Sequence, residues 1–218
     1  MAVHKTARRT LCLLLCLFIF SLAWPSGAGA LGTPSKPSSR TPGGGANSAS
    51  RSYGYLPIWW VEASSTRIDS EFRDKQGNHF TYPAENLYDG KPDTCWVPAL
   101  LRNQVGNGVG DYVDFYFEYS AVIAGISVLN GYCKSKDLFY ANSRPAKLEI
   151  SFLYAGNNYF TDEVYAELKD GYLDYQTFSI PEREDVEAVR VRIAKVYGGT
   201  KYYGDVCISE IRIIGAWM

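Results

Sequence analysis

The stretch DYVDFYFEY, residues 111–119, decides the fold because apolar and polar side chains alternate along it. Val113, Phe115 and Phe117 fall on one face of an extended chain, and Asp114 and Glu118 fall on the other. Successive side chains of a β-strand point to opposite faces, so this period of two predicts a strand with one buried face.

The same alternation recurs through the rest of the body. KLEISFLY (147–154) and AVRVRIAKVY (188–197) repeat it clearly, and weaker runs are PIWWVEAS, AGISVLNGY, EVYAELKD, YQTFSI and CISEIRIIG. Turn-forming sequences such as AGNN (155–158) and KDG (169–171) separate these runs. About eight short strands joined by turns predict an all-β fold, an antiparallel jelly-roll β-sandwich.

The N-terminus reads as an export signal. A basic segment with Lys5, Arg8 and Arg9 precedes the apolar run LCLLLCLFIFSLAW and the small residues PSGAGA. This order predicts a cleavable signal peptide over residues 1–30, although an uncleaved membrane anchor stays open as the alternative. Residues 31–52, rich in Ser, Pro, Thr and Gly, are expected to form a flexible linker. The folded domain is then expected over residues 53–218, in a protein that is secreted or periplasmic.

Charge narrows the range of partners. Loss of residues 1–30 removes three of the 22 basic residues, which leaves 19 against 23 acidic residues and a net charge of −4. Nucleic acids and anionic membranes select basic surfaces. We therefore expect no nucleic-acid partner and no stable membrane insertion after signal cleavage.

The exported part keeps an odd number of cysteines, Cys95, Cys133 and Cys207. One disulfide with a leftover thiol is one interpretation, and three small buried apolar residues is the other. No C-x-x-C pair is present to suggest a zinc site.

Catalytic signatures are missing from the sequence. After signal cleavage the only histidine is His79, and there is no G-x-S-x-G or H-E-x-x-H motif. A pair of carboxylates distant in sequence would still suffice for glycoside hydrolysis. We expect a protein that is not an enzyme, with a carboxylate-based glycoside hydrolase as a remaining alternative.

Four segments together resemble a known module: YPAENLYDGKPDTCWV (82–97), GVGDYVDFYF (108–117), NGYCKSKDLFYANSRPAKLEISF (130–152) and YGGTKYYGDVCISEIRI (197–213). They resemble the discoidin, or coagulation factor 5/8 type C, family, which has a galactose-binding-like jelly-roll fold. The nearest variant is the translocation, or glycan-binding, domain of bacterial NAD glycohydrolases. The resemblance runs from about residue 63 to residue 214 and implies binding without the enzyme that this domain sometimes accompanies.

This resemblance and the strand pattern together place NGYCKSKDLFYANSRP and YGGTKYYGD in connections, where binding residues concentrate on a rigid sandwich. Sugar recognition needs an aromatic face for the ring together with amides and charges for its hydroxyl groups. The candidate ligand-binding residues are Asn130, Tyr132, Lys134, Tyr140, Asn142, Arg144, Tyr202, Tyr203 and Asp205. The alternative is that they hold loops together, for example through an Arg144–Asp205 ion pair.

A calcium site is the only cofactor that the resemblance implies. Asp89, Asp93 and Thr94 in YDGKPDT, with Glu210 in ISEI, resemble positions that bind structural calcium in related sandwiches. Calcium takes six to eight oxygen ligands, and a tight Asp-Gly turn presents several. An ordinary Asp-Gly turn, with Glu210 accepting hydrogen bonds from backbone amides, is the alternative.

Together these patterns predict an exported, non-catalytic module that recognises a carbohydrate or cell-envelope glycan through loops at one end of a β-sandwich. The alternative from another class is a protein-interaction or adhesin domain that uses the same loops.

Overall fold

The computed structural model describes residues 51–99 and 108–218, and its regular elements are mostly strands. The stretch DYVDFYFEY leads into β5 (Tyr112–Asn130), where Val113, Phe115 and Phe117 are buried as the alternation predicts. The signal peptide and all but the last two residues of the linker lie outside the described residues, so both stay predictions.

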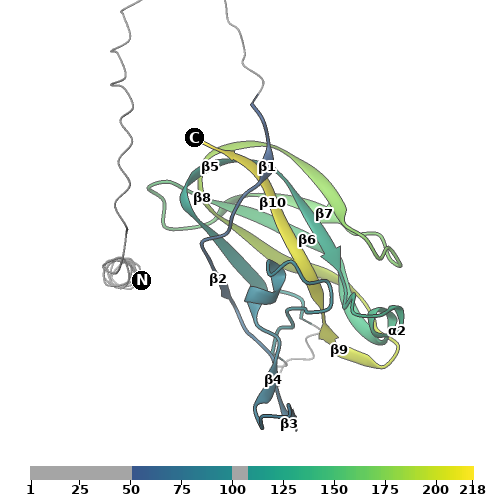
Figure 1. Ribbon diagram of the computed structural model, residues 1–218. Coiled ribbons are helices and arrows are strands. Elements are labelled where there is room, and N and C mark those ends of the chain that lie inside the picture. Colours follow the sequence, from purple (N-terminus) through teal and green to yellow (C-terminus); the bar gives the residue numbers. More distant parts are fainter. Residues whose placement is uncertain (1–50, 100–107) are drawn as a thin grey trace, which may run out of the picture. The chain divides into compact units, whose positions relative to one another are not determined.

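The strands form two antiparallel layers that share the two longest strands, β5 and β8 (Gln176–Tyr197) (Figure 1). The first layer runs in the order β2 (Trp60–Ala63), the first half of β5, the second half of β8, β6 (Asn142–Tyr154) and β7 (Thr161–Glu167). The second runs β1 (Gly54–Tyr55), β10 (Ile208–Trp217), the second half of β5 and the first half of β8.

Bends in β5 and β8 make this sharing possible. Their pairing register shifts between Tyr116 and Ala121, and again before Ile123 and Gly125. Such irregularities bend a strand and increase its twist, which lets one strand pass from one layer to the other. The runs expected as separate strands at 111–119 and 124–132 are therefore one strand, because a bulge replaces the turn between them.

The core lies between the two layers. Phe115, Ile150 and Val191 from the first layer share one buried cluster with Ile126 and Ile213 from the second. This confirms the antiparallel β-sandwich that the alternation predicted. Among the described residues, no helix has the length and apolar character needed to cross a membrane.

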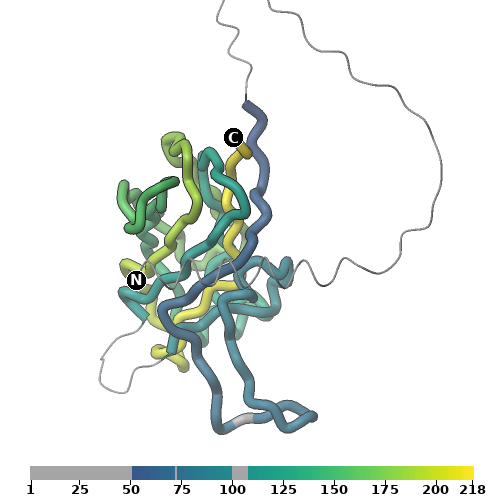
Figure 2. The backbone as a smooth tube through the Cα atoms, turned by 90° about the vertical axis from the view of Figure 1, so that its left-hand side faces the viewer, coloured from purple at the N-terminus to yellow at the C-terminus, as the bar shows by residue number. Residues whose placement is uncertain are grey.

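Short elements gather at the loop end of the sandwich. β3 (Ile68–Arg73) and β4 (His79–Thr81) form a hairpin with its own two-stranded sheet, which projects at the end opposite the C-terminus (Figures 1 and 2). The remaining short elements are η1 (Ala84–Leu87), α2 (Lys136–Ala141) and β9 (Tyr202–Val206), the last of which pairs in parallel with β6. The short helix α2, whose N-cap is Ser135, was not predicted from the sequence.

Candidate functional site

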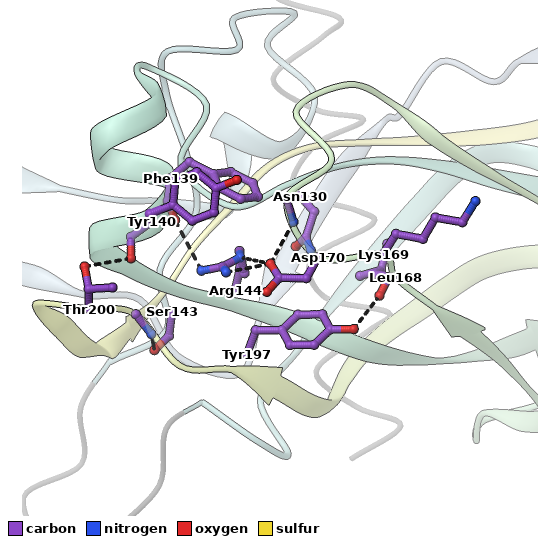
Figure 3. Close-up of polar contacts among 12 residues, drawn as sticks. Asn130, Phe139, Tyr140, Ser143, Arg144, Leu168, Lys169, Asp170, Tyr197 and Thr200 are labelled. Carbon is purple, nitrogen blue, oxygen red and sulfur yellow. Dashed lines mark hydrogen bonds and ion pairs between the residues drawn. The ribbon is translucent and has the colours of Figure 1, made fainter.

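Arg144 lies at the centre of a buried polar cluster that ties three segments together (Figure 3). Its side chain is only 4% exposed. Nε donates a hydrogen bond to Asp170 Oδ1 at 2.7 Å, and Nη2 lies 2.5 Å from the same oxygen. Nη1 donates to the Asn142 carbonyl at 3.2 Å, while the guanidinium lies 4.7 Å from the centre of the Phe139 ring. Arg144 therefore fastens α2 and the start of β6 to the loop after β7.

Other predicted ligand-binding residues of the same loop also form hydrogen bonds within the chain. The Asn130 amide donates to the Pro145 carbonyl and the Asn142 amide to the Leu138 carbonyl, both at 2.8 Å. Both side chains are buried, whereas Tyr140 is half-buried against Phe139. These contacts hold the loop's shape, so the amides are directed at the chain itself.

The second predicted binding segment, YGGTKYYGD (197–205), contributes one member of an ion pair and two exposed rings. Asp205 pairs with Arg67, and burial raises the pKa of Asp205 while Arg67 opposes that rise. The Arg144–Asp205 pair considered in the sequence analysis is not formed, because each residue binds a different partner. Tyr202 and Tyr203 are exposed beside them, at 41% and 69%.

A pocket of about 520 Å³ lies between the β3–β4 hairpin and the loop after β5; we call it the hairpin pocket. Of the candidate ligand-binding residues, only Tyr132 and Lys134 line it. The remaining residues that line the pocket are Asp69, Phe80, Thr81, Tyr82, Asn86, Asp93, Thr94 and Cys95. The predicted ligand residues therefore do not share one hollow, and the hairpin pocket is lined largely by residues that were not predicted as ligand-binding.

The hairpin pocket combines aromatic surface with charged groups. Phe80, Tyr82 and Tyr132 supply the rings, and Asp69 and Asp93 supply carboxylates. Burial raises the pKa of Tyr132 to about 12, with Cys95 and Tyr82 adding to the rise. The Tyr132 hydroxyl is therefore protonated at neutral pH and able to donate a hydrogen bond.

The hairpin left only a faint signal in the sequence. The segment IDSEFRDKQGNHFT has a turn at Gly77, whose φ is +87°, but its flanking runs are short and mostly polar. Phe80, which is 46% exposed, is the clearest indication of a binding surface, because an exposed aromatic ring beside a turn does not pack in the core.

The candidate calcium residues divide between two places. The Thr94 hydroxyl donates to the Asp89 carboxylate at 3.0 Å, and Glu210 lies against Asp89, while Asp93 lines the hairpin pocket. Glu210 is 1% exposed, and its Oε1 has no hydrogen-bond partner among the described residues. Burial and the neighbouring Asp89 carboxylate raise the pKa of Glu210 to about 7.

Beside Glu210 and Gly90 there is a second pocket of about 200 Å³, which β1 and β10 also line. In the described part of the chain, no three His, Cys, Asp or Glu side chains converge in an arrangement that could hold a metal ion. A cation here would need hydroxyl and carbonyl oxygens in addition to the two carboxylates.

Comparison with known proteins gives one family and a set of similar folds. The sequence model of the NAD glycohydrolase translocation F5/8 type C domain matches residues 59–214. No curated protein matches the chain.

Among solved structures, an F5/8 type C domain from Bacteroides fragilis is 14% identical with a TM-score of 0.52, over 76% of this chain and 98% of that one. CBM32-3 from a family 31 glycoside hydrolase of Clostridium perfringens is 14% identical with a TM-score of 0.50, over 75% and 90%. A truncated AlyQ with CBM32 and alginate lyase domains is 15% identical with a TM-score of 0.48 over 77% of this chain, which spans 34% of its length. At such identities the first two similarities establish the fold only.

Proposed function

Because the chain belongs to the NAD glycohydrolase translocation F5/8 type C domain family, we propose that it is an exported, non-catalytic module that binds carbohydrate in the hairpin pocket. The observation that supports this proposal is the pocket itself, about 520 Å³ in volume and lined by aromatic rings together with polar and charged side chains. That volume lies within the usual range for small-ligand sites, roughly 300–1,000 Å³.

The residues of the pocket match what a sugar requires. The C–H face of a pyranose ring packs against aromatic rings such as Phe80, Tyr82 and Tyr132. Its hydroxyl groups can donate to Asp69 and Asp93 and accept from Lys134, and hydrogen bonds to ionised groups are the stronger kind.

The charge of the pocket indicates which sugars it selects. Two carboxylates face one ammonium group, so a ligand that carries its own carboxylate is repelled. Neutral and amine-bearing sugars are therefore preferred over uronic acids.

The test is a glycan array with the purified protein, followed by titration of the tightest neutral ligand. Tyr132→Ala should weaken binding about tenfold or more, since the lost ring contact and its buried area amount to about 1.4 kcal/mol or more. Tyr159→Ala is the matched control, because Tyr159 is 63% exposed and outside the pocket. Equal affinities for these two variants would contradict the proposal, as would a preference for acidic sugars.

One observation favours a second function. Asp69 and Asp93 lie in the same pocket, and glycoside hydrolysis uses two carboxyl groups that flank the scissile bond. Sugar release that disappears in Asp93→Asn would establish the hydrolase. The protein-interaction alternative would be established by a protein partner that is pulled down with the native chain but not with Tyr132→Ala, in the absence of glycan binding.

We also propose that calcium binds between Asp89 and Glu210. Two adjacent carboxylates, one of them buried with an unpartnered oxygen, favour either a shared proton or a cation. Thr94 Oγ1 and the Lys91 carbonyl, which already accepts from Thr94 at 2.8 Å, supply further oxygens.

Calcium in the millimolar range should raise the melting temperature at pH 8, and a chelator should reverse the rise. Asp89→Asn and Glu210→Gln should abolish the rise, whereas Asp93→Asn should keep it because Asp93 lines the hairpin pocket. A rise that survives Glu210→Gln would exclude this site.

A further inference from the structure

Cys95 and Cys207 meet behind the wall of the hairpin pocket, although 111 residues separate them in sequence (207 − 95 − 1). Each comes directly before a residue of an isolated antiparallel bridge, Trp96 and Ile208. The bridge is closed by two backbone hydrogen bonds, from Trp96 N to the Ile208 carbonyl at 2.9 Å and from Ile208 N to the Trp96 carbonyl at 3.2 Å. Because the bridge is antiparallel, Cys95 falls opposite Ser209 and Cys207 falls opposite Val97, so the two cysteines are diagonal neighbours across the bridge.

Alternation along these segments turns the cysteines to the same side. Trp96 and Ile208 point into the main core, so their neighbours point the opposite way. Cys95 and Cys207 form a second, small buried cluster with Val97, and Tyr82 and Tyr132 of the pocket pack against it. Each cysteine is a free thiol that is 1% exposed, and the Cys95 thiol lies close enough to raise the pKa of Cys207.

Cys133 is placed differently. It is half-buried in the loop after β5, where its thiol donates to the Asn130 carbonyl at 3.2 Å. It lies outside the small buried cluster that contains Cys95 and Cys207.

We propose that Cys95 and Cys207 form a disulfide bond when the chain folds in an oxidising environment, and that Cys133 is the leftover thiol. With oxidised glutathione as oxidant, the Cys95 thiolate attacks one glutathione sulfur and releases one glutathione thiolate. The Cys207 thiolate then attacks the Cys95 sulfur of the mixed disulfide and releases the second. Two protons leave the protein thiols, and their two electrons reduce one glutathione disulfide to two thiols.

The bond forms during folding rather than after it. In the folded reduced chain both sulfurs are shielded, and contact with Cys95 and burial together raise the pKa of the Cys207 thiol. The reactive thiolate is therefore scarce once the sandwich has closed. Once formed, the bond would fix the irregular segment that carries Cys95, and with it one wall of the hairpin pocket.

Peptide mapping tests the pairing directly. The full chain, with Cys12→Ser and Cys16→Ser to remove the other thiols, is unfolded, reduced and refolded with oxidised and reduced glutathione. Free thiols are then blocked with N-ethylmaleimide and the chain is digested with trypsin. The three cysteines fall in separate peptides, residues 76–102, 103–134 and 202–212. We expect peptide 76–102 joined to 202–212, with 103–134 carrying the maleimide.

Three other results would overturn the proposal: maleimide on all three peptides, peptide 76–102 joined to 103–134, or peptide 103–134 joined to 202–212. As matched variants, Cys133→Ala should keep the cross-link, whereas Cys207→Ala should lose it and melt about 5 °C or more below Cys133→Ala. If Cys207→Ala fails to fold, the mapping of the chain that keeps all three cysteines still decides the matter.

Discussion

The Arg144 guanidinium is enclosed by Phe139, Tyr140 and Tyr197, with Asp170 as its counter-charge. A guanidinium fits this place because it is planar, stacks on rings and donates in several directions at once. A lysine has the same charge but neither the shape nor the number of donors.

We expect Arg144→Lys to lower the free energy of unfolding by about 2–4 kcal/mol, because Asp170 and two carbonyls lose donors in a buried place. Glycan affinity of the folded variant should be unchanged, since Arg144 does not line the pocket. Urea unfolding and titration at low temperature measure the two effects, and exposed Arg73→Lys is the control for stability. Lost binding with unchanged stability would instead make Arg144 a ligand residue.

Glu210 makes stability depend on pH. Its pKa in the folded chain is about 7, above its ordinary value of 4.5, so the folded state holds the proton more tightly than the unfolded state. Without calcium, the free energy of unfolding should therefore fall as pH rises from about 4.5 to about 7, by up to about 3 kcal/mol.

Urea unfolding at pH 5 and pH 8, in chelator, measures this fall. Glu210→Gln should reduce it, whereas Glu85→Gln, an exposed change in η1, should leave it intact. Parallel pH profiles for the native chain and Glu210→Gln would contradict the prediction.

At the scale of elements, the pairing of β5 with β8 carries a charged pair on its outer face. Asp114 lies directly opposite Arg190 in the register, and the two form a bidentate contact at 2.7 and 2.8 Å. The Arg190 guanidinium also lies 3.8 Å from the centre of the Tyr112 ring. Asp114 is buried, so the face that alternation assigns to solvent is covered here by side chains.

We expect Asp114→Asn to lower the free energy of unfolding by about 3 kcal/mol, because it leaves Arg190 without its carboxylate in a largely buried place. A double-mutant cycle with Arg190→Gln should give a coupling energy above about 1 kcal/mol. The cross-strand pair Lys147–Glu167, at 2.8 Å with Glu167 exposed, is the control and should couple by less than about 1 kcal/mol. Equal coupling in both pairs would show that burial adds nothing.

At the scale of the whole molecule, the sandwich is a rigid support and the β3–β4 hairpin is an attachment to it. The hairpin forms a sheet of its own, and backbone hydrogen bonds among Arg67, Tyr82 and Val97 fasten its base. Binding and stability should therefore be separable.

Replacement of residues 69–80 by a short Gly-Ser turn removes Asp69 and Phe80 from the pocket. We expect glycan binding to be lost, while the melting temperature changes by less than about 4 °C, equivalent to roughly 1 kcal/mol at this size. The same replacement in the exposed turn at residues 156–159 should leave both unchanged. Retained binding would place the ligand site elsewhere on the sandwich.

The layer-crossing of β5 and β8 also belongs to this scale, and it marks the limit of the sequence-based prediction. Alternation identified the strands because it is a local signal, repeated every second residue. It did not show that two predicted strands were one bent strand, because a bulge is defined by the partner strand it pairs with.

What the sequence determined by itself is the β-sandwich and the family, since strand period and ordered motifs are properties of neighbouring residues. Only the tertiary structure decided which polar groups face inward and which line a pocket. Asn130, Asn142 and Arg144 looked available, yet each is buried against partners brought close by the fold. The hairpin pocket joins segments around residues 69–82, 86–95 and 132–134. The pocket forms only because these segments, which are distant in sequence, pack next to one another, and no local sequence pattern predicts that packing.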